Sequence, residues 1–149
     1  MAATMAMAAM TGCGDHDNVA YTRFVNVPDD GWNTLDGREF HPFDEDTLPT
    51  GRYRMLVAMR HSERYPRTAI WLELEQSDST GVTRLDTISI PVTDSAGRFL
   101  GEGHFGLYEV VDTIPGTVSV TPGWQLSIRH IMRDEEVAGL NNIGLILLK

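Results

Sequence analysis

The residues best suited to catalysis in this sequence are two carboxylates beside a tryptophan, Glu73 and Glu75 with Trp71. The run Arg67–Glu75 alternates between polar and apolar residues, so in a strand these three side chains share one face. Two residues of strand rise separate the carboxylates by roughly 6–7 Å, and the two acids of a glycosidase lie about 5–9 Å apart. The simpler interpretation is a solvated outer face with one exposed aromatic residue. Without catalysis, Trp71 and Tyr65 are candidates for a glycan- or protein-binding platform.

The other motifs with catalytic potential are weak. Residues 101–106 fit the pattern GxGxxG, which binds a dinucleotide only between a strand and a helix. A strand-like segment follows here, so the sequence predicts a glycine-rich bend between strands. The sequence has no HExxH, Walker A loop or Gly-x-Ser-x-Gly elbow, and its five histidines lack the spacing of metal ligands. His130 falls on an inward strand face and is predicted to be a buried, hydrogen-bonded core residue. We therefore expect no enzyme activity, no cofactor and no metal.

Basic residues gather in one part of an acidic chain. Five of the twelve lysines and arginines lie within sixteen positions: Arg52, Arg54, Arg60, Arg64 and Arg67. The first three alternate with apolar residues in Gly51–Arg60, which predicts a strand with these arginines on its outward face. Pairing with the strand that carries Glu73 and Glu75 is the simpler interpretation. The alternative is a docking patch for an acidic partner, with Arg60 as a contact residue.

The elements that would position these residues are short strands with glycine and proline turns between them. Nine segments have a strand pattern: Val19–Val27, Arg38–Phe43, Gly51–Arg60, Arg67–Glu75, Leu85–Val92, Phe105–Val111, Thr117–Val120, Trp124–Met132 and Ile143–Lys149. The last segment is apolar on both faces, which is typical of a central strand covered on both sides. No amphipathic helix of three turns is evident. The sequence predicts an all-β fold, one antiparallel β-sandwich of eight or nine strands and jelly-roll type, over residues 19–149.

The bulk composition restricts the partners. A chain of 149 residues fits one domain. Its net charge of −9 disfavours nucleic acid as a partner and disfavours electrostatic binding to anionic lipid. Membrane attachment would therefore be hydrophobic or covalent. The single cysteine, Cys13, excludes an intrachain disulfide.

Cys13 stands at the end of an apolar segment rich in alanine and methionine. Residues 1–12 are too few to span a membrane but suit the core of a signal peptide. Residues 10–13, Met-Thr-Gly-Cys, resemble a lipobox, in which cleavage precedes a lipid-modified cysteine. We expect a signal peptide over 1–12, truncated at its start, and a lipidated cysteine with a polar linker over 13–18. A flexible tail with an incidental cysteine is the alternative.

A series of different short motifs extends along the whole chain. They are Gly31-Trp32, Met59-Arg60, Tyr65-Pro66, Trp71-Leu72, Asp86-Thr87-Ile88, Asp94 with Gly97-Arg98, Leu100-Gly101 with Gly103, Met132-Arg133, Gly139 and Gly144-Leu145. This ordered series, from Cys13 to the C-terminus, resembles the GldH family, the gliding-motility lipoproteins of certain Gram-negative bacteria.

The resemblance implies a membrane-anchored envelope lipoprotein, with a lipid such as palmitate on Cys13. It also implies attachment to the outer membrane, on the periplasmic side or at the cell surface. The domain would act without catalysis, through contacts with proteins of gliding motility, the associated secretion machinery or envelope assembly. The alternative from the residues is a surface carbohydrate-binding module or glycosidase that uses Trp71 with Glu73 and Glu75.

Overall fold

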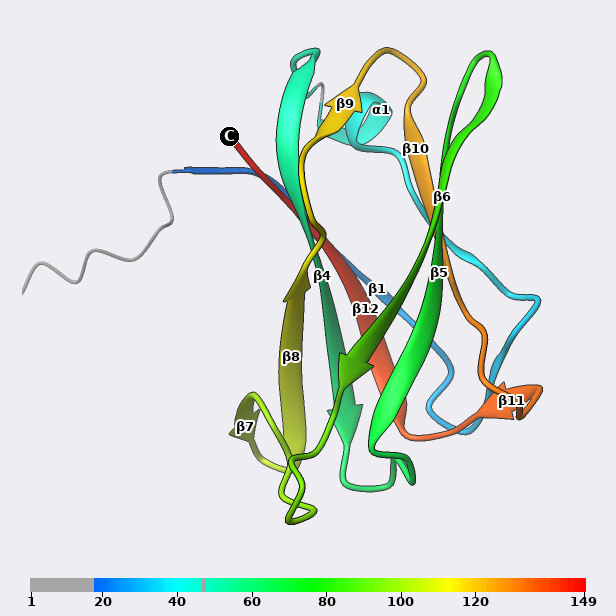
Figure 1. Cartoon of the computed structure of the whole chain (residues 1–149), viewed down its shortest axis with the longest axis vertical. Helices are drawn as coiled ribbons and strands as arrows, with labels where there is room; N and C mark the ends of the chain where they lie inside the picture. Colours follow the sequence, from blue (N-terminus) through cyan, green and yellow to red (C-terminus); the bar gives the residue numbers. More distant parts are fainter. Residues whose placement is uncertain (1–17, 47) are drawn as a thin grey trace, which may run out of the picture.

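The computed structural model of the protein describes residues 18–46 and 48–149, which form two antiparallel sheets around one core (Figure 1). The first sheet has six strands in the order β1–β12–β4–β8–β7, and β9 also pairs with β4. Its strands are β1 (Val19–Asn26), β4 (Gly51–Ser62), β7 (Glu102–His104), β8 (Leu107–Thr113), β9 (Val118–Val120) and β12 (Leu140–Leu148). We call it the six-stranded sheet.

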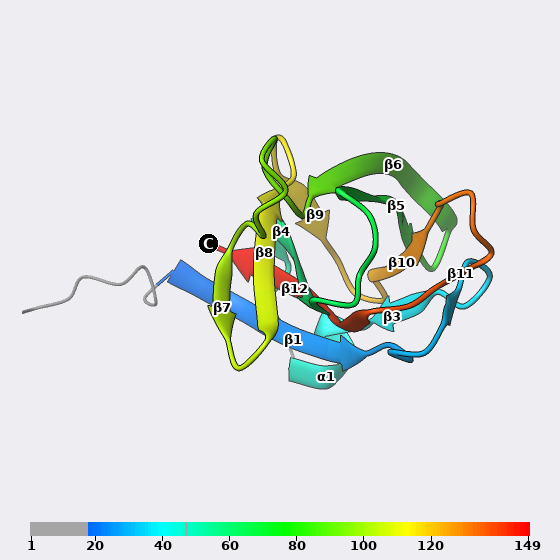
Figure 2. The same cartoon turned by 90° about the horizontal axis from the view of Figure 1, so that it is seen from below.

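The second sheet has four strands in the order β3–β10–β5–β6. Its strands are β3 (Arg38–Phe40), β5 (Ala69–Asp78), β6 (Gly81–Pro91) and β10 (Gln125–His130). A small third sheet joins β2 (Trp32–Asn33) to β11 (Glu136–Val137). Seen from below, the two main sheets lie opposite each other and enclose the core (Figure 2).

Strict alternation explains why these segments form half-buried strands. In β4, Tyr53, Met55, Val57 and Met59 are buried, and the residues between them face outward. In β5, Ile70, Leu72 and Leu74 are fully buried on the opposite side of the core. The expected hairpin is present, because β5 and β6 pair antiparallel with Leu72 opposite Ile88. The predicted all-β class is confirmed.

The structure differs from the predictions in two details. It has twelve strands in its described part rather than eight or nine, because β2, β7 and β11, of two or three residues each, have no counterpart among the nine predicted segments. The predicted strand Arg38–Phe43 ends at Phe40, and the helix α1 (Pro42–Asp46) follows. Pro42 lacks a backbone N–H to pair in a sheet, and its fixed φ suits the first position of a helix.

The C-terminal strand β12 is central, as predicted, since it lies between β1 and β4. Its inward residues Ile143, Leu145 and Leu147 are fully buried. Its outward residues Ile146 and Leu148 are only half-buried, so the strand is not covered on both sides by the described residues. Within residues 18–46 and 48–149, no helix has the length and apolar character needed to cross a membrane. The predicted signal segment 1–12 and Cys13 lie outside the described residues.

Candidate functional site

The outer face of the four-stranded sheet carries the predicted group Trp71, Glu73 and Glu75. Trp71 is 49% exposed. Glu73, however, lies opposite Arg129 of β10, and the Arg129 Nε donates a hydrogen bond of 2.7 Å to its Oε1. The Glu73 carboxylate is therefore the acceptor of a cross-strand ion pair, and it is only 18% exposed. This arrangement is typical of a solvated outer face that balances its own charges.

The structure does not place Tyr65 beside Trp71 on a surface. Tyr65 is 3% exposed, and its hydroxyl donates a hydrogen bond of 2.9 Å to the carbonyl oxygen of Ala69. Burial raises the pKa of the Tyr65 phenol, which keeps the group protonated as a donor. The ring belongs to the core and offers no binding platform with Trp71.

Arg60 lies on the outer face of β4, and its Nε donates a hydrogen bond of 2.8 Å to Glu109 Oε2. Its guanidinium carbon also lies 3.7 Å from the centre of the Phe24 ring. Arg60 therefore forms a cross-strand ion pair, but its partner is Glu109 of β8. Pairing with Glu73 or Glu75 is not possible because β4 and β5 belong to different sheets.

The glycine-rich stretch at residues 101–106 contains the short strand β7 and its turn into β8, so only its last two residues form the predicted bend between strands. Gly101 has φ +82°, and a Cβ there would lie 2.0 Å from the carbonyl oxygen of Glu109. In β7, Gly103 packs on the Tyr108 ring, where a Cβ would come within 2.7 Å. Phe105 and Gly106, with φ of 52° and 78°, form the two-residue turn from β7 to β8. Phe105 is fully exposed at this tip.

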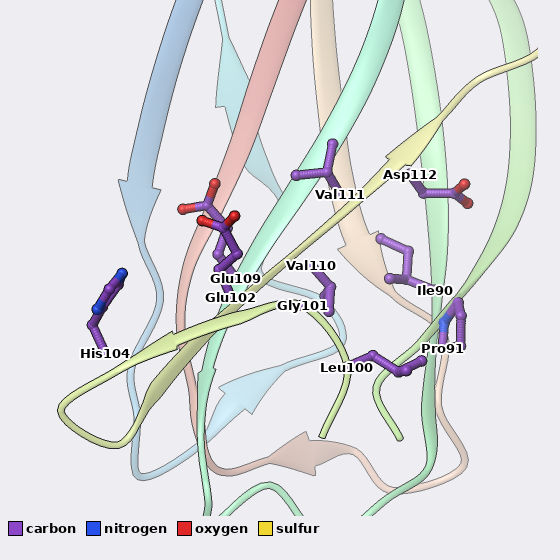
Figure 3. A pocket seen from close by; sticks show the side chains of 10 residues that line it. All are labelled: Ile90, Pro91, Leu100, Gly101, Glu102, His104, Glu109, Val110, Val111 and Asp112. Atoms are coloured by element: carbon purple, nitrogen blue, oxygen red, sulfur yellow. The ribbon is translucent and has the colours of Figure 1, made fainter. Parts of the chain in front are cut away.

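A cleft of about 600 Å³ lies at the open edge between the two sheets (Figure 3). It is lined by Ile90, Pro91, Leu100, Gly101, Glu102, His104, Glu109, Val110, Val111 and Asp112. These residues come from the end of β6, the segment before β7, β7 itself and β8. Glu102 and Glu109 are direct cross-strand neighbours, and their carboxylates lie together in Figure 3. Like charges in this position repel, so the cleft favours a basic or apolar guest over an acidic one.

Each main sheet buries one histidine. His130 of β10 is fully buried, as predicted, and its Nε2 lies 2.7 Å from the carbonyl oxygen of Trp32. That nitrogen carries the proton because a carbonyl only accepts, while Nδ1 accepts from the N–H of Met132 at 3.4 Å. Burial lowers the pKa of His130.

His61 of β4 is also fully buried, and sequence reasoning did not identify it. Its Nδ1 lies 3.1 Å from the carbonyl oxygen of Ser62, and its Nε2 has no hydrogen-bond partner in the described part of the chain. The ring packs among Tyr65, Phe99 and Tyr108, with centroids 5.5–6.1 Å away. Burial lowers the pKa of His61. The alternation of β4 contains the signal, because His61 continues the inward row that begins at Tyr53.

The outer face of the six-stranded sheet is apolar over its centre, which sequence reasoning noted only for the last strand. Leu56 and Ala58 of β4 lie beside Ile146 and Gly144 of β12, and Val111 of β8 lies beside Ala58. Val111 is 46% exposed. We call these five residues the apolar centre. No group of three or more histidine, cysteine or acidic side chains within residues 18–46 and 48–149 is arranged to hold a metal ion.

Comparison with known proteins gives one family. The sequence model of the GldH lipoprotein family matches residues 19–147, which is the whole sandwich. No curated protein matches the sequence.

Among solved structures, Eiger TNF from S. frugiperda is similar with a TM-score of 0.38 and 14% identity. That match covers 67% of this chain and 60% of the other. The dimeric latent PorU of Porphyromonas gingivalis is similar with a TM-score of 0.27 and 12% identity, over 86% of this chain and 10% of that one. Both TM-scores are below 0.5, so no conclusion about function follows from either likeness.

Proposed function

The chain belongs to the GldH lipoprotein family, and from this premise we propose that it is an outer-membrane lipoprotein whose sandwich is a non-catalytic docking domain. Cys13 would carry the lipid, and the domain would act in gliding motility or in the associated protein secretion and envelope assembly. The observation that carries the proposal is the family match over residues 19–147. Cys13 lies six residues before the first strand, so the anchor would hold the sandwich close to the membrane.

The charge pairing on the two outer faces supports a domain without catalysis. The carboxylate best placed for acid–base chemistry by sequence, Glu73, accepts from Arg129 at 2.7 Å. On the other sheet, Glu109 accepts from Arg60 in the same way. Both carboxylates are held in cross-strand ion pairs on outer strand faces, an arrangement typical of a structural role.

The test of the anchor is the mass of the N-terminal peptide of the mature protein, isolated from cell membranes of its own bacterium. We expect a peptide that begins with Cys13 and carries acyl chains. The variant Cys13→Ser should move from the membrane fraction to the soluble fraction, because protein charge of −9 gives no electrostatic attachment to anionic lipid. The variant His16→Ala, three residues away, is the matched control and should stay in the membrane fraction. An unmodified peptide that begins at Met1 would contradict the proposal.

The role in motility or secretion is tested by complementation. A strain that lacks the protein should lose gliding or the export of secreted proteins, and wild type should restore it. Cys13→Ser should fail to do so although its sandwich is intact. A deletion strain that glides and secretes as wild type does would exclude this role.

A further inference from the structure

The apolar centre of the six-stranded sheet is unusual for the outer side of an antiparallel sheet, which normally alternates with polar residues. Ala58 is fully buried although it faces outward, and Leu56 and Ile146 are half-buried. Phe24 of β1 lies over Gly144, where a Cβ would come within 2.5 Å of its ring. The apolar surface left on this face comes from Val111, Leu56 and Ile146, and apolar groups grouped on an outer sheet face are typical of a contact surface.

The two ends of this face carry opposite charges. Arg52 and Arg54 project from one end of β4, and both are exposed. At the other end lie Glu109, which is held by Arg60, and the exposed Glu102. Neither Arg54 nor Glu102 forms an ion pair within the part of the chain that the structure describes. Six residues of β4 separate Arg54 from the row of Arg60, which is roughly 20 Å along the strand.

The surface at the acidic end of this face is also concave. A second cleft, of about 420 Å³, is lined there by Arg60, Glu102, His104, Phe105, Leu107, Tyr108, Glu109 and Asn142. An incoming arginine fits such a site, because its alkyl stem packs on apolar side chains while its guanidinium reaches a carboxylate. The unpaired Glu102 is the natural acceptor.

We propose that this face binds a second copy of the same chain, so that the protein forms a two-fold symmetric dimer through its two six-stranded sheets. A two-fold axis that runs between the faces and across the strands reverses the strand direction of the second copy. It therefore places the basic end of each copy over the acidic end of the other. Arg54 of one chain then lies over the row of Arg60, Glu109 and Glu102 in its partner, which carries one net negative charge, and the same contact is repeated by symmetry.

The size and charge of the face agree with this pairing. Four strands as long as β12 cover roughly 30 Å by 19 Å, or about 570 Å². This is close to the roughly 600 Å² per partner at the low end of specific interfaces. Two chains of net charge −9 repel each other at long range, so alignment of their opposite ends is needed to offset that repulsion.

The dimer is also compatible with the proposed lipid anchor, although it does not depend on it. β1 is an edge strand of the six-stranded sheet. An axis across the strands leaves β1 of both copies at the same side of the dimer. Both chains then leave the sandwich on that side, just before Val19, where two anchors can enter one membrane.

The first experiment measures the oligomeric state of the full chain by sedimentation equilibrium at low ionic strength. The chain carries Cys13→Ser, so that neither acylation nor a disulfide between copies contributes. We expect a reversible dimer. Val111→Arg should weaken it by at least about tenfold in dissociation constant, because it adds a charge to the apolar centre. Leu85→Arg is the matched control, since Leu85 is 57% exposed on the other sheet and should leave the dimer unchanged.

The second experiment tests the charge pairing. Arg54→Glu and Glu102→Lys each create two repulsive contacts in the dimer, and each should weaken it by about tenfold at low ionic strength. Mixing the two variants should restore dimers, since the introduced glutamate then lies over a row made basic by the lysine, and the native Arg54 lies over the native acidic row.

The mixing experiment distinguishes a symmetric dimer from binding of any other partner to this face. A chain that stays monomeric at every concentration would overturn the proposal. Monomers that instead bind lipid vesicles or another envelope protein through this face would overturn it in favour of that partner. Equal effects of Val111→Arg and Leu85→Arg would also contradict it.

Discussion

The two outer faces of the sandwich differ although both sheets cover the same core. The outer side of the four-stranded sheet has Thr87, Glu73 and Arg129 in one polar cross-strand row, and Trp71 and Leu85 are single exposed apolar residues beside it. The outer side of the six-stranded sheet has one polar row, in which Arg60 pairs with Glu109, and an apolar centre next to it. Solvent alone would select polar residues on both sides.

This difference shows which part of the residue pattern of a strand indicates a role other than folding. Alternation with a polar outer side is sufficient to form a half-buried strand. β5 shows this minimal pattern, whereas β12 adds Gly144, Ile146 and Leu148 on its outer side. The added apolar residues do not enlarge the core between the sheets. Gly144 makes room for the Phe24 ring, and Ile146 and Leu148 stay half-buried, so these two are available to a contact outside the chain.

Each sheet buries one histidine on its inner side, and the two histidines differ in their hydrogen bonds. The largest effect on stability should come from His130→Leu, which leaves the carbonyl of Trp32 and the N–H of Met132 without partners. We expect a loss of about 1–3 kcal/mol in the free energy of unfolding. His61→Leu should cost about 1 kcal/mol or less, because it removes one hydrogen bond to Ser62 and a buried nitrogen that had no partner. Denaturant titrations at neutral pH measure both, and a larger loss for His61→Leu would reverse this ranking.

The same histidines predict how stability depends on pH. Burial lowers the pKa of both below the ordinary value of 6.5, so below that pH the unfolded chain binds protons that the folded chain does not. Their contribution to stability is therefore complete above pH 6.5 and is lost as the pH falls toward their folded pKa values. We expect the free energy of unfolding to fall as the pH drops below about 6.5, and the fall to be smaller in His61→Leu and in His130→Leu. An unchanged slope in both variants would contradict this origin.

The strands were predictable because they depend on local alternation. Rows of inward residues in β4, β5 and β12 follow directly from the period of two. The two-residue strands β2 and β11 were not predictable, because their pairing joins Trp32 to Val137 across most of the chain. Such pairing depends on the folded topology and leaves no periodic signal.

In the candidate site, too, local alternation was predictable and pairing between distant strands was not. The shared face of Trp71, Glu73 and Glu75 was predicted correctly from alternation. The partner of Glu73 was not, because β10 lies beside β5 only in the folded sheet. Tyr65 was placed on a surface but is buried, since it follows the end of β4 and alternation does not extend into a loop.

The smallest expected effect is the most informative about the two outer faces. Val111→Thr and Leu85→Thr each replace one exposed aliphatic side chain in a strand, 46% and 57% exposed, by a residue that suits strands. Each should change the free energy of unfolding by no more than about 0.5 kcal/mol when measured at a dilution where the chain is monomeric.

At higher concentration only Val111→Thr should lose the extra stability that association gives to the folded state. Equal stability when dilute and unequal stability when concentrated would assign the apolar centre to binding. A large loss for Val111→Thr in the dilute monomer would assign it to folding instead, and the contrast between the faces would then have no functional meaning.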